Sequence, residues 1–78
     1  MFDDTILQEI FKVVLDLPPE ADVESIRQVT TKRWDSLANV SMAAAIESEY
    51  GIRLDPADAE RMTSYQAVRL LLEERSGG

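Results

Sequence analysis

Hydrophobic residues recur at helical spacing in three stretches of this 78-residue chain. The first stretch predicts a helix from about Asp4 to Asp16, closed by Pro18 and Pro19, which cannot donate backbone hydrogen bonds. Thr5 and Gln8 have the spacing of a capping box, which predicts that Thr5 caps this helix. Its apolar positions are Ile6, Leu7, Ile10, Phe11, Val14 and Leu17.

A second helix is predicted from Ser36 to Tyr50, because Asp35 is a suitable N-cap and Gly51 a suitable residue to end it. This helix is apolar on two sides. One side, expected to face the core, carries Met42, Ile46 and Tyr50, with Asn39 beside them; the other carries Leu37, Val40 and Ala44. The second side either lies under a loop or forms a docking strip for partner proteins. Asn39 either hydrogen-bonds at the open end of the bundle or lines the entrance of a cavity.

The remaining pattern predicts a long connection and two further helices. After Pro19 the chain is mostly polar, and four scattered apolar residues are expected to hold it over the core: Val23, Ile26, Val29 and Trp34. Asp55 and Pro56 predict a short third helix. Thr63 and Gln66 have capping-box spacing and begin a last helix, with Tyr65, Val68, Leu71 and Leu72 facing inward. Because no stretch has the pattern of a strand, we expect an all-α, four-helix bundle of three longer helices and one short third helix, in a single domain over residues 1–78.

Composition narrows the classes of function. Fifteen acidic residues against eight basic ones give a net charge of −7, which argues against nucleic-acid binding and favours basic partner surfaces. No apolar run approaches the ~20 residues of a membrane span, and no secretory leader opens the chain. We therefore expect a cytoplasmic monomer that binds neither nucleic acid nor membrane. The absence of Cys excludes thiolate metal sites, and any thiol chemistry would have to be imported on a prosthetic group.

Ser36 is the most informative candidate for chemistry. It follows the N-cap Asp35 at the first position of the second helix, where free N–H groups and the helix dipole favour a phosphate. The chain contains no His that could activate the hydroxyl as a nucleophile. The sequence therefore predicts that another protein modifies Ser36, and phosphorylation by a kinase would use the same helix terminus.

Nearly the whole chain resembles the acyl carrier protein family. The resemblance rests on the opening helix, the long first loop and Asp35-Ser36-Leu37 before the second helix. It continues through Glu49-Tyr50-Gly51-Ile52 at the end of that helix, the short third helix and Thr63-Ser64 before the last helix. The resemblance implies a helical bundle of acyl-carrier type.

The resemblance also implies a function. Ser36 would receive 4′-phosphopantetheine from coenzyme A and carry acyl groups as thioesters, without being an enzyme itself. Asp35 and Leu37 would be read by the phosphopantetheinyl transferase. The partners would include an acyl-loading ligase or acyltransferase and a downstream synthase or transferase. The docking residues implied are Trp34, Val40, Ala44 and Glu47.

Departures from the family pattern narrow the expected role. Arg33 and Trp34 stand where Gly-Ala or Gly-Gly is usual, and Ala38 and Ser41 stand at usually acidic positions. This form resembles carriers that serve a dedicated fatty-acid-like, polyketide-like or secondary pathway. Trp34 either shapes the exit of the arm and the choice of partner or is an aromatic lid on the core. The alternatives are an aminoacyl or peptidyl carrier and, in another class, a helical interaction module in which Ser36 is never modified.

Overall fold

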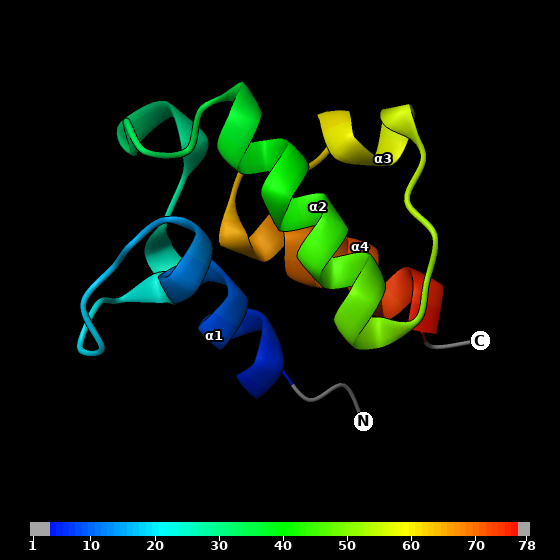
Figure 1. Cartoon of the computed structure of the whole chain (residues 1–78), viewed down its shortest axis with the longest axis horizontal. Helices are drawn as coiled ribbons and strands as arrows, with labels where there is room; N and C mark the ends of the chain where they lie inside the picture. The colour runs from blue at the N-terminus through cyan, green and yellow to red at the C-terminus, as the bar shows by residue number, and fades with distance from the viewer. Residues whose placement is uncertain (1–3, 77–78) are drawn as a thin grey trace.

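Four α-helices form within residues 4–76, the part of the chain that the computed structural model describes (Figure 1). They are α1 (Thr5–Val14), α2 (Ser36–Tyr50), α3 (Pro56–Glu60) and α4 (Tyr65–Ser76). Two 3-10 turns, η1 (Val23–Ser25) and η2 (Gln28–Thr30), lie in the connection between α1 and α2. Residues 4–76 contain no strand, so the expected all-α bundle with a short third helix is confirmed.

The bounds of α2 agree with the prediction at both ends. The Asp35 carboxylate accepts a hydrogen bond from the Ala38 N–H at 2.8 Å, which satisfies one of the unpaired donors of the first turn. At the other end Gly51 has a φ of 64°, a left-handed conformation that glycine adopts without steric cost. Local signals therefore fix the position of Ser36 at the start of the helix.

The beginnings of α3 and α4 are capped by side chains. Asp55 accepts from the Asp58 N–H at 2.9 Å, as its position before Pro56 predicts. Ser64 accepts from the Ala67 N–H at 3.0 Å and lies directly before α4. The prediction that the cap would be Thr63 is wrong by one residue, because the adjacent hydroxyl has the capping position.

The helix predicted from about Asp4 to Asp16 is confirmed as α1, one residue shorter at its start and two at its end, but the prediction that Thr5 caps it is wrong. The residue before the helix is Asp4, whose side chain makes no capping bond, and Thr5 lies inside the helix rather than at its cap. The helix ends at Val14 because Asp16 adopts a φ of 54°, which turns the chain before the prolines are reached. The Leu17 N–H then donates back to a carbonyl of the last turn, as in a Schellman motif.

The long connection is held partly by apolar side chains. Val23 and Trp34 are buried and Ile26 is partly buried, as expected. Val29 is 81% exposed, so the prediction that it would pack on the core is wrong. It lies in η2, a single 3-10 turn that contributes no buried residue.

Backbone hydrogen bonds between distant segments also hold this connection. The Gln28 N–H donates to the Thr63 carbonyl at 2.8 Å, and the Tyr65 N–H donates to the Ile26 carbonyl at 3.0 Å. The two bonds form an isolated antiparallel bridge between the long connection and the start of α4. The loop before Ser36 is thereby fixed to the end of the molecule where α4 begins.

Three aromatic side chains from three segments meet in the core. The Phe11 ring is edge-on to Trp34 at 5.2 Å and to Tyr65 at 5.0 Å between ring centroids. The Tyr65 hydroxyl donates to the Asp4 carboxylate at 2.8 Å. Burial is the main cause that raises the pKa of Tyr65, and this bond is the second. Around these rings lie Leu7, Ile10, Leu15, Val23, Met42, Ile46, Met62, Val68, Leu71 and Leu72.

Candidate functional site

Ser36 is an exposed residue at the first position of α2. The Ala38 N–H is taken by the Asp35 carboxylate, and the Asn39 N–H donates to the Asp35 carbonyl at 2.9 Å. The N–H groups of Ser36 and Leu37 make no hydrogen bond within residues 4–76. Two backbone donors and the positive end of a 15-residue helix therefore adjoin the Ser36 hydroxyl.

The surroundings of Ser36 suit an anion, because two backbone donors point from the helix terminus. The chain has no His, and the carboxylate of the adjacent Asp35 caps the helix. Residues 4–76 contain no cluster of His, Cys, Asp or Glu that could hold a metal ion.

A strip of apolar side chains follows Ser36 on the outer face of α2. Leu37 is 76% exposed and Val40 is 67% exposed, and Ala44 continues the strip as an exposed residue. The interpretation that this strip lies under a loop is therefore wrong. An exposed apolar strip on a helix is typical of a surface that contacts other proteins.

Trp34 lies in the core, because its side chain is only 2% exposed. A partner cannot contact this ring directly, so the prediction that Trp34 is a docking residue is wrong. Its burial favours the alternative that Trp34 is an aromatic lid on the core. Its indole N–H donates to the Asn39 side-chain oxygen at 2.9 Å. Asn39 in turn donates to the Ala59 carbonyl on α3 at 3.2 Å. Asn39 thus links the segment before Ser36 to α3.

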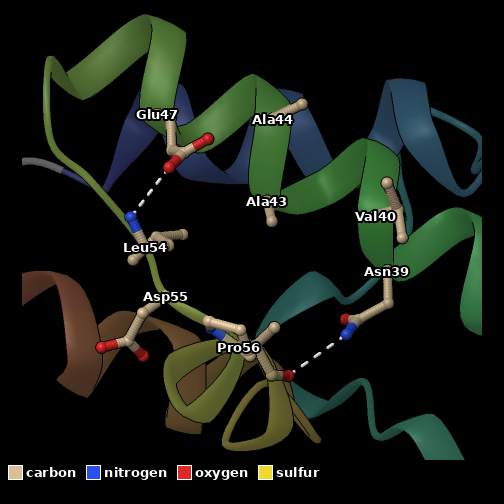
Figure 2. A pocket seen from close by; sticks show the side chains of 9 residues that line it. Asn39, Val40, Ala43, Ala44, Glu47, Leu54, Asp55 and Pro56 are labelled. Atoms are coloured by element: carbon tan, nitrogen blue, oxygen red, sulfur yellow. Dashed lines mark hydrogen bonds between the residues drawn. The ribbon is translucent and has the colours of Figure 1, made fainter.

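A groove of about 300 Å³ separates α2 from α3 (Figure 2). Figure 2 shows Asn39 and Ala43 directed from α2 toward the segment that carries Leu54 and Pro56. The groove brings together three of the predicted docking residues, Val40, Ala44 and Glu47, and its other lining residues are Asp55 and Ala59. The hydrogen bonds of Asn39 to Trp34 and Ala59 confirm the first of its two interpretations, and its side chain also lines this open groove.

Glu47 has a structural role that the sequence does not suggest. Its carboxylate accepts a hydrogen bond from the Leu54 N–H at 2.8 Å, and so it holds the segment between α2 and α3 against α2. Figure 2 shows this contact at one end of the groove. One carboxylate oxygen is engaged within the fold, so Glu47 is only partly available to a partner.

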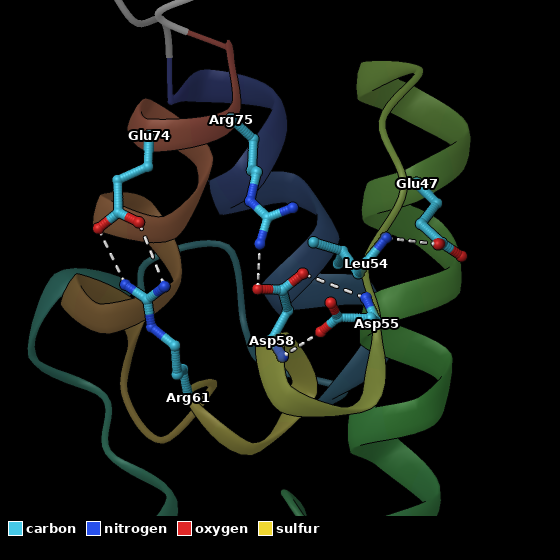
Figure 3. Close-up of polar contacts among 7 residues, drawn as sticks. All are labelled: Glu47, Leu54, Asp55, Asp58, Arg61, Glu74 and Arg75. Atoms are coloured by element: carbon cyan, nitrogen blue, oxygen red, sulfur yellow. Dashed lines mark hydrogen bonds and ion pairs between the residues drawn. The ribbon is translucent and has the colours of Figure 1, made fainter.

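Two ion pairs tie the short α3 segment to α4 (Figure 3). The buried Asp58 carboxylate pairs with Arg75 and also accepts from the Asp55 N–H at 3.1 Å, completing a capping box. Arg61 binds both carboxylate oxygens of Glu74, at 3.2 and 2.9 Å, and this hydrogen bonding lowers the pKa of Glu74. A helix of five residues is thereby held in a defined position beside the groove.

Sequence reasoning missed Asp58. The spacing of Asp55 and Asp58 is that of a capping box with a second carboxylate, and this signal could have been recognised. The pairing of Asp58 with Arg75 could not, because the two residues belong to different helices.

Within residues 4–76, no helix combines the length and the apolar character needed to cross a membrane. A scan of protein-family models, a search of curated proteins and a search of solved structures each returned no match.

Proposed function

We propose that this chain is a non-catalytic carrier of acyl-carrier type, in which Ser36 accepts 4′-phosphopantetheine from coenzyme A. The observation that carries the proposal is the exposed Ser36 hydroxyl beside two unpaired N–H groups at the start of α2. A phosphodiester on this oxygen would be a permanent anion, which the helix N-terminus stabilises. Because the chain has no Cys, the thiol that holds the cargo would come from the attached arm.

The exposed strip supports an interaction with a phosphopantetheinyl transferase. Leu37 and Val40 hold apolar surface in water within the first two turns after Ser36, where a modifying enzyme must contact the chain. Burying such side chains contributes about 1.5–3 kcal/mol each, enough to matter in a transient complex. The loading ligase or acyltransferase and the downstream synthase or transferase would use the same strip in turn, since each must reach the arm.

The groove between α2 and α3 offers apolar surface to an acyl cargo. Its walls carry Val40, Ala43, Leu54 and Pro56, and its polar lining is Asn39, Glu47 and Asp55. An apolar chain attached near Ser36 would lose contact with water there. An aminoacyl cargo remains the alternative, because its free ammonium group could pair with Glu47 or Asp55. The absence of acidic side chains in the first turn of α2 supports a carrier of a dedicated pathway.

The proposal is tested by incubating the purified chain with coenzyme A and a broad-specificity phosphopantetheinyl transferase, followed by intact-protein mass spectrometry. We expect one phosphopantetheine adduct on the wild type and none on Ser36→Ala. Ser41→Ala, which removes another exposed hydroxyl from α2, serves as the matched control and should be modified like the wild type. A folded wild type that gains no adduct with several transferases would refute the proposal in favour of an unmodified interaction module.

A further inference from the structure

A second groove, of about 410 Å³, lies between α1 and α2. Its apolar surface comes from Ile6, Ile10 and Val13 of α1 and from Ala45 of α2. Val13 is 77% exposed, although it stands on the helix that supplies much of the core. Ala45, whose side chain is short, lines the hollow on the α2 side.

This groove is separate from the surfaces assigned to Ser36. Ala45 and Glu49 project from a different side of α2, about 140° around the helix axis from Val40 and Ala44, given about 100° of rotation per residue. Figure 1 shows α1 and α3 on either side of α2. At about 1.5 Å per residue, Ala45 lies about 14 Å along the helix axis from Ser36. A protein seated in the α1–α2 groove would leave the first turn of α2 uncovered.

Each wall of the groove carries an unpaired carboxylate. Glu9 stands on the α1 wall and Glu49 on the α2 wall, and both are exposed. Neither carboxylate has a hydrogen bond or ion pair with any residue in the range 4–76. An apolar floor with an acidic group on each side matches a segment that has an apolar stripe between two rows of basic side chains.

We infer that the α1–α2 groove binds a basic amphipathic helix of a partner protein, with apolar residues over Val13 and Ala45 and lysines or arginines beside Glu9 and Glu49. The chain would thus stay bound to one protein while it presents Ser36 to another. The size of the groove corresponds to a transient contact with a Kd in about the micromolar range. This inference holds whether or not Ser36 is modified.

The test uses a fluorescein-labelled synthetic helical peptide with leucines at i, i+3, i+4 and i+7 and lysines on both sides of them, and measures fluorescence anisotropy with the full chain. Two further peptides, one with serines for the leucines and one with glutamates for the lysines, should bind at least about 10-fold more weakly. Equal binding of the serine peptide would show that net charge alone attracts the probe, and would overturn the inference.

Matched substitutions locate the peptide on the surface. Val13→Ser should weaken binding about 10-fold, whereas Val29→Ser, at an equally exposed valine, should not. The double variant with Glu9→Gln and Glu49→Gln should bind the peptide about 10-fold more weakly. The control double variant, with Glu20→Gln and Glu60→Gln, removes the same charge elsewhere on the surface and should change the affinity less than about 2-fold. If the control variants weaken binding as much as the groove variants, the inference is wrong.

Filling the groove gives an independent test. Ala45→Leu should abolish peptide binding while leaving the circular dichroism spectrum and Tm unchanged or raising Tm, because the larger side chain covers apolar surface on α1. Undiminished binding to folded Ala45→Leu would contradict the inference. Sedimentation of the wild type should show a monomer; a dimer that Ala45→Leu dissociates would instead assign the groove to a second copy of this chain.

Discussion

Replacing Asn39 by Ala should destabilise the chain far more than a change at a half-buried polar residue of a helix usually does. Asn39 accepts from the indole of Trp34, which is buried, and donates to the Ala59 carbonyl on α3. Leaving the indole N–H unsatisfied costs about 1–3 kcal/mol, and losing the bond to Ala59 costs about 0.5–1.5 kcal/mol. The better helix propensity of Ala offsets about 0.6 kcal/mol.

The net loss of unfolding free energy expected for Asn39→Ala is therefore about 2 kcal/mol. For a domain of this size, about 2 kcal/mol lowers Tm by about 8–16 °C. Urea unfolding followed by far-ultraviolet circular dichroism measures the free energy, since helix content reports on the whole bundle. Ser41→Ala, on the exposed face of the same helix, is the control and should change the free energy by less than about 0.5 kcal/mol.

A double-mutant cycle tests whether the loss comes from the bond to the indole. Trp34→Phe removes the N–H donor, and the double variant with Asn39→Ala should be more stable than additivity predicts, by about 1 kcal/mol. A loss below about 0.5 kcal/mol for Asn39→Ala, or additive effects in the cycle, would refute the role assigned to Asn39.

Substitutions at Asp58, Leu37 and Tyr65 test a buried ion pair, the exposed strip and a buried hydroxyl. Asp58→Asn keeps an acceptor for the cap of α3 but removes the charge paired with Arg75, so urea unfolding should show a loss of about 1–2 kcal/mol; an unchanged stability would contradict this. Leu37→Asp should change the free energy of unfolding by less than about 0.5 kcal/mol, because the side chain is exposed. It should lower the kcat/KM of modification by a phosphopantetheinyl transferase at least about 10-fold, and unchanged kinetics would show that Leu37 is not part of the docking strip. Burial and the bond to Asp4 raise the pKa of Tyr65 above its ordinary value of 10.0. The contribution of the protonated Tyr65 hydroxyl to the free energy of unfolding is therefore complete below the ordinary pKa and is lost as the pH rises toward the raised pKa. Urea unfolding at about pH 8 and about pH 11 should therefore show a steeper decline for the wild type than for Tyr65→Phe, and equal slopes would contradict the assignment.

The parts of the fold set by neighbouring residues could be predicted from the sequence. Asp35 and Gly51 bound α2 because a cap and a left-handed residue act within one turn of the helix end. Asp55 and Pro56 likewise begin α3. These signals depend only on residues a few positions apart, and they place Ser36 without any knowledge of the tertiary structure.

The parts set by contacts between distant segments could not be predicted. The Asp4 side chain accepts from Tyr65 instead of capping α1, and this partner lies 61 residues away in the chain. Val29 has the same apolar character as Val23, yet it is exposed, and η2 contributes no buried residue. Which of two similar residues is buried depends on the path of the connection.

The candidate site shows the same division. Leu37 and Val40 could be assigned to an outer face from helical periodicity alone, and their exposure confirms it. The place of Trp34 in the core depends on Phe11 and Asn39, which lie on two different helices. The use of Glu47 to hold the segment at Leu54 depends on how the chain returns after α2.

Whether Ser36 holds a phosphopantetheine arm is tested most simply by the mass of the chain purified from the cells that produce it, with the modified residue located by fragmentation. We predict one 4′-phosphopantetheine group per chain, attached to Ser36 and to none of the other serines. The unmodified mass, or a phosphate alone on Ser36, would contradict the proposal that this chain is a carrier.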